Sequence, residues 1–224
     1  MYTSILDINR LMTDGDIRRT PPLEDAPVSS SKNDIRADLL AARERMSPFV
    51  IAQVNAELAE WMYALPVPVA PGDTVAAYVA VGDEPGGTAM LDALGDRGLR
   101  VLLPVVPPGP PTRLLWGEYR GEDALVHGRW DLLEPAESLG ADAIGAARAI
   151  LVPAIGADRS GGRLGRGAGY YDRTLTTADA PIIAVVYDDE LVDRLPQADD
   201  DVPVDWVLTP GGGFIRTPHL TVNE

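Results

Sequence analysis

The stretch AARAILVPAIGADRSGGRLGRGAGYYDR, residues 146–173, contains a strand, a glycine-rich loop and the start of a helix in succession. Its apolar beginning, 146–153, predicts a buried strand, and the segment 170–179 predicts a helix. Between them Gly165, Gly167 and Gly169 alternate with other residues, and Arg163 and Arg166 lie in the same loop. The question is whether this loop binds an anion or only connects the strand to the helix.

The glycine spacing alone does not answer that question. Glycines at alternate positions let successive backbone N–H groups face one concavity, which suits an anion, and the N-terminus of the following helix favours the same charge. Arg163 and Arg166 could add donors for phosphate oxygens. However, the loop has neither the Lys-Ser/Thr of a Walker A motif nor the GxGxxG spacing, so a plain turn before a helix explains the glycines about as well.

On both sides of this stretch, short apolar runs alternate with helical patterns. Ser31 is expected to cap a first helix and Pro48 to open a second one, 48–65. Further helices are predicted at 88–98 and 189–195, and strands at 73–81, 99–106, 181–188 and 204–210. This order predicts an α/β fold with a mostly parallel open sheet and helices on both faces.

The carboxyl ends of the strands are the expected ligand side of such a sheet. This rule selects the loops after Val79–Val81 and after Val152–Pro153, and the end of the strand at Leu208. Residues 1–30 contain TPPLEDAPVSS and are rich in Pro, Ser and acidic residues, so we expect a flexible extension there and a single domain over 31–224.

Composition excludes several classes of function. The net charge of −15 argues against nucleic acid and anionic membrane surfaces as partners, because both would repel the chain. The chain has no cysteine, which excludes disulfides, thiolate nucleophiles and Cys-based zinc sites. We see no membrane-spanning apolar run and no signal peptide, so the expected location is the cytoplasm.

The segment LVPAIGADRSGGRLGRGAGYYDR, 151–173, closely resembles the signature of the 5-formyltetrahydrofolate cyclo-ligases, which are also called methenyltetrahydrofolate synthetases. That signature is a strand ending in Val-Pro, then an Asp, a Gly and RLGxGxGYYD. Further segments resemble the family in the same order between Lys32 and about Thr209. They are KNDIR (32–36), VAAYVAVGDE (75–84), WDLLEP (130–135) and DELVDRLPQADDDVPVDWVLT (189–209).

The resemblance implies a fold like that of NagB and ribose-5-phosphate isomerase. It also implies the conversion of 5-formyltetrahydrofolate and MgATP to 5,10-methenyltetrahydrofolate, ADP and phosphate, with only small molecules as partners. The sequence leaves the oligomeric state open, and a monomer is the expectation. The formyl oxygen attacks the γ-phosphate, N10 then closes the ring, and phosphate departs. Such a reaction needs positioning and charge neutralisation rather than a covalent nucleophile.

The resemblance further implies a role for each matching residue. ATP is expected to contact Lys32, Arg36, Arg163, Leu164, Gly165, Arg166, Gly167, Ala168, Gly169, Tyr170 and Tyr171, and Arg163, Arg166 and Lys32 are the expected catalytic cations. The folate is expected to contact Val79, Glu84, Trp130 and Tyr170. Mg²⁺ is expected at Asp172 and Asp201, with Asp199 and Asp200 as alternatives to Asp201.

The chain departs from the family pattern in three places. Ala157 stands where an aromatic residue is common, Ala168 stands where relatives carry Gly or Lys, and the segment GDEPGGT around Glu84 is one residue longer than usual. The altered loop at Glu84 leaves a relative that activates a different amide or formamide as a second hypothesis. A non-catalytic nucleotide- or folate-binding module is a third, and the retention of Lys32 and Arg163 argues against it.

Overall fold

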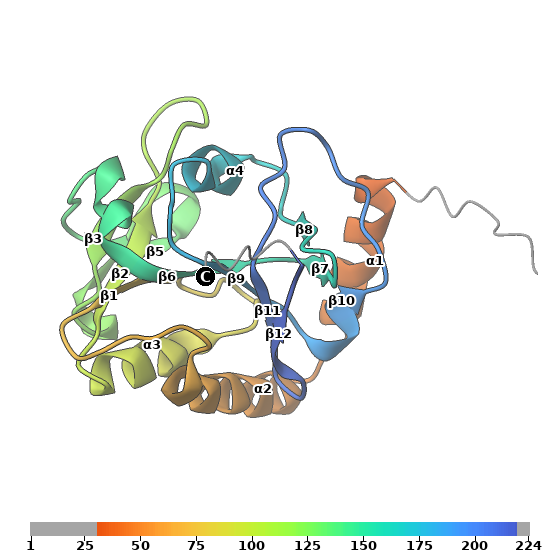
Figure 1. Cartoon of the computed structure of the whole chain (residues 1–224), viewed down its shortest axis with the longest axis horizontal. Helices are drawn as coiled ribbons and strands as arrows, with labels where there is room; N and C mark the ends of the chain where they lie inside the picture. The colour runs from red at the N-terminus through yellow and green to blue at the C-terminus, as the bar shows by residue number, and fades with distance from the viewer. Residues whose placement is uncertain (1–30, 219–224) are drawn as a thin grey trace, which may run out of the picture.

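The described part of the chain, residues 31–218, forms a central seven-stranded sheet in a computed structural model (Figure 1). The strand order is β12-β11-β9-β6-β1-β2-β3. The strands are β1 (Thr74–Ala76), β2 (Arg100–Val105), β3 (Leu115–Glu118), β6 (Ala147–Pro153), β9 (Ile182–Val185), β11 (Trp206–Thr209) and β12 (Gly213–Arg216). The β2–β3 and β11–β12 pairs are antiparallel and the other neighbours are parallel, which confirms the predicted mostly parallel sheet.

The strand order reverses between β1 and β6. From β1 the chain continues to β2 on one side, whereas β6 leads to β9 and β11 on the other. The loops that leave β1 and β6 therefore diverge at their carboxyl ends and leave a crevice between them, which is where open α/β sheets bind ligands.

Helices cover both faces of the sheet, as predicted. On one face, α2 (Pro48–Trp61) and α3 (Gly87–Asp96) pack against side chains such as Val75 and Leu151. On the other face, α4 (Tyr170–Leu175) packs against strand residues whose side chains point to that face, such as Ala76 and Val152. Figure 1 shows α2 and α3 on one side of the sheet and α4 on the other. Successive residues of a strand point to opposite faces of the sheet. The same five strands, β1, β2, β6, β9 and β11, therefore supply side chains to both layers of the core.

The starts of the first two helices follow the sequence signals. Ser31 caps α1 (Lys32–Arg43), and Asp34 reaches back to the Ser31 backbone, which completes a capping box. Ser47 caps α2, and Pro48 occupies its first turn. The start of α1 thus brings Lys32 and Arg36 onto one face, one turn apart.

Two small sheets flank the large one. One has the order β10-β7-β8, with β7 (Gly156–Asp158), β8 (Arg163–Leu164) and β10 (Leu191–Val192), and α1 lies against it through Leu39 and Gly156. The other pairs β4 (Leu125–His127) with β5 (Leu133–Pro135). Short 3₁₀ turns occupy η1 (Met62–Ala64), η2 (Glu122–Ala124), η3 (Arg129–Asp131), η4 (Ala141–Ala146) and η5 (Asp188–Glu190).

The predicted helix 189–195 is wrong. The chain makes only the 3₁₀ turn η5 and then pairs Leu191 and Val192 with β7 as the strand β10. Tertiary pairing overrides the helical spacing because it gives the backbone partners in a sheet and half-buries both side chains. Several other elements are shorter than predicted, since β1 ends at Ala76, α4 ends at Leu175 and β9 ends at Val185.

Residues 1–30, for which we expect a flexible extension, and residues 219–224 lie outside the described part of the chain. Within 31–218, no helix is long and apolar enough to cross a membrane.

A buried ion pair attaches α1 to the rest of the fold. The side chains of Arg43 and Glu190 are 1% and 4% exposed, and Arg43 Nε lies 2.5 Å from Glu190 Oε1. Arg43 also donates to the carbonyl of Ala154, just after β6, and its guanidinium lies 5.4 Å from the ring centre of Tyr187. Burial raises the pKa of Glu190, while the hydrogen bond from Arg43 favours the ionised carboxylate.

Removing one partner of this pair is expected to destabilise the fold strongly. Arg43→Met leaves Glu190 buried without its cation, so we expect the free energy of unfolding to fall by about 3–5 kcal/mol. Urea denaturation followed by circular dichroism measures this loss. The double variant Arg43→Met/Glu190→Leu removes both charges and should recover most of the stability. If Arg43→Met is as stable as the wild type, the ion pair between Arg43 and Glu190 does not hold α1 on the fold.

Candidate functional site

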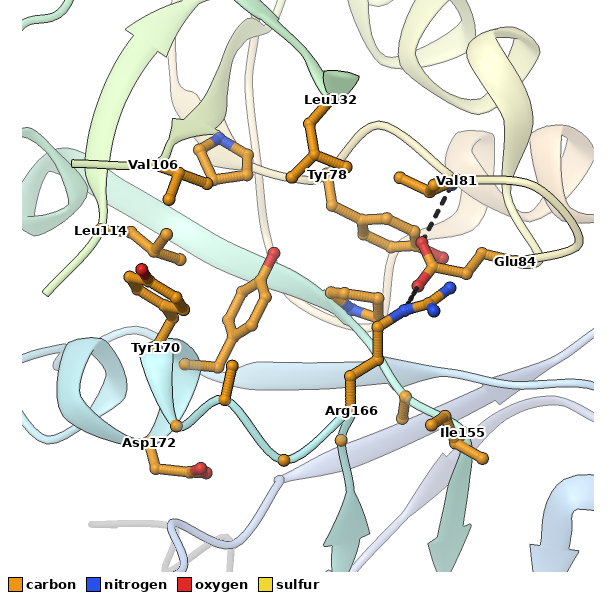
Figure 2. Close-up of a pocket in the computed structure, with 18 of the residues that line it drawn as sticks. Tyr78, Val81, Glu84, Val106, Leu114, Leu132, Ile155, Arg166, Tyr170 and Asp172 are labelled. Carbon is orange, nitrogen blue, oxygen red and sulfur yellow. Dashed lines mark hydrogen bonds and ion pairs between the residues drawn. The ribbon is translucent and has the colours of Figure 1, made fainter. Parts of the chain in front are cut away.

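An apolar cavity of about 350 Å³ lies at the point where the strand order reverses. Tyr78 and Val79 after β1, and Pro153 and Ala154 at the end of β6, form its floor. In Figure 2, Glu84 and Arg166 lie at one end of the cavity and Tyr170 at the other. The remaining lining residues are Val81, Pro104, Val106, Leu114, Trp130, Leu132, Ile155, Arg163, Gly165, Gly167, Ala168, Gly169, Tyr171 and Asp172.

A second, polar cavity of about 600 Å³ lies on the other side of the glycine loop. It is lined by Lys32, Arg36, Arg163, Leu164, Gly165, Gly167, Ala168, Gly169, Asp172, Arg173, Thr176, Ala198, Asp200 and Asp201. Six residues line both cavities, namely Arg163, Gly165, Gly167, Ala168, Gly169 and Asp172. The glycine loop is therefore the wall between an apolar cavity and a charged one.

The backbone of this wall has a conformation that favours glycine. Gly167 and Gly169 have φ angles of 93° and 73°, in the region that side chains with a Cβ rarely adopt. At Gly169 an added Cβ would lie 2.3 Å from Arg173 Nη1, which hydrogen-bonds to the Gly169 carbonyl. Two of the three alternating glycines are thus required by the backbone itself.

Asp158 fixes the segment that leads into the loop. Its carboxylate is fully buried and accepts hydrogen bonds from the backbone N–H groups of Ser160, Gly162 and Leu195, and from the Ser160 hydroxyl. Burial alone would raise the pKa of Asp158, but the hydrogen bonds from Ser160, Leu195 and Gly162 hold it below its ordinary value. The signature Asp therefore acts as an anchor for the turn between β7 and β8.

Each cation near the loop lies against an acceptor. Arg163 is 5% exposed and its Nη2 pairs with Asp172 at 2.5 Å, while its buried Nε has no hydrogen-bond partner among the described residues. Lys32 pairs with Asp201, and Arg36 Nε donates to the Gly165 carbonyl at 2.9 Å. Burial opposes ionisation of Asp201, but the hydrogen bond from Lys32 lowers the pKa of this carboxyl. Lys32 and Arg163 are thus paired with carboxylates, whereas Arg36 contacts a neutral carbonyl and keeps its charge uncompensated by an ion pair among the described residues.

Glu84 closes one end of the apolar cavity. Its carboxylate is nearly buried and accepts from Arg166 Nε at 2.8 Å and from the Val81 backbone N–H at 3.0 Å (Figure 2). The Tyr187 hydroxyl donates to the carbonyl of Asp83 at 2.8 Å and so fixes the neighbouring backbone. The longer loop at this position still directs Glu84 into the cavity.

Two tyrosines of the apolar cavity, Tyr78 and Tyr171, have a raised pKa and keep their phenol proton at neutral pH. Burial raises the pKa of Tyr171 and of Tyr78 above the ordinary value of a phenol, and the charge of Glu84 adds to the effect in both cases. Tyr78 donates its hydroxyl to the carbonyl of Pro85. These rings therefore offer apolar faces and neutral hydroxyls to a ligand.

The structure brings the residues selected from the sequence into these two cavities. The residues expected to contact folate, Val79, Glu84, Trp130 and Tyr170, all line the apolar one. Of those expected to contact ATP or Mg²⁺, Lys32, Arg36, Arg163, Leu164, Gly165, Gly167, Ala168, Gly169, Asp172 and Asp201 line the polar one. Arg166, Tyr170 and Tyr171 lie on the apolar side of the loop, and their contact with ATP stays a prediction.

One of the three expected strand ends does not line either cavity. The end of β11 at Leu208 was expected to face the ligand, but the strand order reverses between β1 and β6, and β11 lies beyond β9. The end of β2 contributes instead, through Pro104 and Val106. Sequence reasoning also missed Leu114 and Leu132, which lie in an excursion with little regular periodicity. Two of these residues had a usable signal, because Val106 ends the predicted strand 99–106 and Leu132 lies in the segment WDLLEP.

The polar cavity has the donors that a magnesium–phosphate ligand requires. Within 31–218, no group of three or more His, Cys, Asp or Glu side chains is arranged to bind a metal ion by itself. Mg²⁺ commonly takes only one or two carboxylates and completes its shell with phosphate oxygens and water. Asp172 and Asp201, with Asp200 beside them, fit that requirement, whereas Asp199 does not line the cavity.

The fold and the two cavities are typical of α/β enzymes, in which the ligand site lies at the reversal point of the strand order. A profile of the 5-formyltetrahydrofolate cyclo-ligase family matches residues 28–210, and the chain belongs to that family. A 5-formyltetrahydrofolate cyclo-ligase of Mycolicibacterium smegmatis is 48% identical over 83% of this chain and 96% of its own length. One of Escherichia coli is 30% identical over 75% of this chain and 94% of its own length.

Solved structures agree with this membership. The chain is similar to 5,10-methenyltetrahydrofolate synthetase of Aquifex aeolicus, with a TM-score of 0.71, 25% identity and coverage of 86% of this chain and 96% of that one. The synthetase of Mycoplasma pneumoniae shares the fold, with a TM-score of 0.61, 22% identity and coverage of 80% and 98%.

The anchoring role of Asp158 predicts a pH-dependent loss of stability. Asp158→Asn places an amide N–H₂ against backbone donors, so the free energy of unfolding at pH 7 should fall by about 1–3 kcal/mol. Because the folded-state pKa of Asp158 is lowered, its contribution is full above about pH 4 and is lost as the pH falls through that pKa. The gap between variant and wild type should therefore narrow on acidification.

Urea denaturation at several pH values between 7 and 3 measures this gap. The exposed Asp179, changed to Asn, is the matched control and should show no gap at any pH. A gap for Asp158→Asn that stays constant or widens in acid would exclude the buried carboxylate as its source.

Proposed function

We propose that the chain converts 5-formyltetrahydrofolate to 5,10-methenyltetrahydrofolate with consumption of MgATP and release of ADP and phosphate. The observation that carries the proposal is the glycine loop, which has an apolar cavity on one side and a charged cavity on the other. A reaction between a folate and a nucleoside triphosphate needs an apolar cavity for the folate and an adjoining charged cavity for the triphosphate. We also propose that the chain acts as a monomer.

The apolar cavity suits a reduced folate. Its walls combine aliphatic and aromatic side chains with two carboxylates, Asp172 in the wall shared with the polar cavity and Glu84 at the end away from Tyr170. Glu84 accepts hydrogen bonds from Arg166 and Val81, and a carboxylate of this kind is a good acceptor for the N–H groups of a pterin ring.

The polar cavity suits the triphosphate of MgATP. Lys32, Arg36 and Arg163 supply positive charge, and the backbone of the glycine loop approaches the same space. Asp172 and Asp201 would hold Mg²⁺, which neutralises phosphate charge when bound.

The chain's contribution to the reaction is to position the reactants and to neutralise charge. The formyl oxygen forms a bond to the γ-phosphorus as the bond to ADP breaks. N10 then attacks the activated formyl carbon and loses its proton, and phosphate leaves with the former formyl oxygen. Arg163 is the residue best suited to the charge on the transferring phosphoryl group, because it lines both cavities and its Nε has no partner among the described residues.

Activation of a different amide or formamide is the remaining alternative. Its motive was the longer loop at Glu84, yet that loop still directs Glu84 into the apolar cavity. The structure offers no observation that favours it over folate.

Arg163→Gln tests the charge-neutralising role. Methenyl absorbance in the near ultraviolet, followed with 5-formyltetrahydrofolate and MgATP, should show a fall in turnover of about 10²–10³-fold because the transition-state charge loses a donor. Arg159→Gln is the control, since Arg159 is exposed in the preceding turn and lines neither cavity. Wild-type turnover in Arg163→Gln, with an unchanged melting temperature, would contradict the role of the loop.

Asp201→Asn tests the metal site. We expect the Mg²⁺ concentration for half-maximal binding of a fluorescent ATP analogue to rise about tenfold or more, because a carboxylate ligand is lost. Asp199→Asn should leave this concentration unchanged, as Asp199 does not line the polar cavity. Equal effects of the two substitutions would place the metal elsewhere.

A further inference from the structure

Arg129 lies at the apolar cavity, and the proposed reaction gives it no role. Its guanidinium carbon is 4.1 Å from the centre of the Trp130 ring, and its Nη1 is 3.2 Å from the Tyr170 hydroxyl. Both aromatic residues line the cavity. Tyr170 marks the end opposite to Glu84 and Arg166 (Figure 2), so Arg129 adds a cation at that far end.

Only Nη1 of the Arg129 guanidinium makes hydrogen bonds to the described part of the protein. Nη1 donates to the carbonyl of Gly109 at 2.6 Å and of Pro107 at 3.3 Å, as well as to Tyr170. Nε and Nη2 make no hydrogen bond or ion pair within 31–218, although a guanidinium has five N–H donors. The neighbouring Asp131 pairs with His127 instead. Arg129 is thus oriented by the protein while keeping donors for another acceptor.

The backbone beside Arg129 is strained. Trp130 and Asp131 have φ angles of 56° and 62°, a region that non-glycine residues seldom adopt. This conformation keeps the Trp130 ring 60% exposed, stacked on Arg129 and edge-on to Tyr170 at 6.1 Å between ring centres. Strain that keeps a large aromatic ring exposed beside a cavity points to a ligand that stacks on it.

A reduced folate has a polar pterin ring, an aromatic p-aminobenzoyl group and a glutamate tail with carboxylates. The apolar cavity has a matching order, with Glu84 at one end, aromatic walls, and Arg129 at the other end. We propose that Arg129 binds a tail carboxylate through its free donors and that the p-aminobenzoyl ring packs on Trp130. This inference rests on the proposed function and makes Arg129 a determinant of specificity for glutamylated folates.

A comparison of two substrates tests the inference. Wild type and Arg129→Gln are assayed with 5-formyltetrahydrofolate and with a pteroate derivative, 5-formyltetrahydropteroic acid amide, in which an uncharged carboxamide stands in place of the glutamate. We expect the substitution to lower kcat/KM for the glutamylated substrate about three- to tenfold, mainly through KM, because a charge-assisted hydrogen bond is lost. With the amide we expect little change. Arg129→Lys should recover part of the loss, and the exposed Arg120, changed to Gln, is the control.

The outcomes separate binding of the tail from a structural role. An equal loss on both substrates would mean that Arg129 only positions Trp130, and no loss on either would mean that the tail binds elsewhere. Both results overturn the inference. If the wild type binds the folates but does not turn them over, the proposed function fails. In that case the dissociation constants of the two folates, measured by quenching of tryptophan fluorescence in wild type and Arg129→Gln, still test Arg129.

Discussion

The buried ion pair between Arg43 and Glu190 is the contact on which the geometry of both cavities depends. Arg43 ends the helix that begins with Lys32, and it donates to the carbonyl of Ala154 at the floor of the apolar cavity. Glu190 in turn accepts from the backbone N–H of Tyr187, whose hydroxyl holds the loop of Glu84. One desolvated charge pair thus sets the position of a helix on the charged side and of a loop on the apolar side.

The site itself is arranged as neutralised pairs. Lys32 with Asp201, Arg163 with Asp172, and Arg166 with Glu84 each combine a cation with a carboxylate. The first two pairs line the polar cavity, where the proposed magnesium–nucleotide ligand carries both signs of charge and would supply a new partner for each member of a pair. A free metal ion would pair only with the carboxylate of each pair, and a free polyphosphate only with the basic side chain. In either case the other member of the pair loses its partner of opposite charge. The arrangement therefore favours the two together over either alone.

The sequence was most informative where one local segment determines both conformation and chemistry. The glycine loop, the strand before it and the start of α4 were predicted from a single stretch. The cap of α1 at Ser31 and the start of α2 at Pro48 were predicted from equally local signals. Local propensity failed at Leu191 and Val192, where pairing with β7 decides the structure. It also failed to reveal the antiparallel edge strands β3 and β12, since pairing at a sheet edge depends on the strand already in place.

Contacts between distant segments could not be predicted by pattern alone. Lys32 and Asp201 are 169 residues apart, and Arg43 and Glu190 are 147 apart, in a chain with many candidate charges. The family resemblance named Lys32 and Asp201 but did not indicate that these two side chains form an ion pair. Arg129 was missed because nothing in its local sequence distinguishes it from the other arginines, and only the fold brings it, with its chain neighbour Trp130, to Tyr170.

The wall between the cavities is a single backbone with little side-chain bulk, since Gly165, Gly167, Ala168 and Gly169 line both sides. A single compound that carries a flat aromatic head on one side and a phosphate mimic on the other could therefore occupy both cavities at once. Joining the two parts makes the second binding step intramolecular, with an effective concentration in the millimolar range for a short linker. Such a bisubstrate ligand would gain selectivity over ordinary nucleotide-binding proteins, because those lack the adjoining apolar cavity.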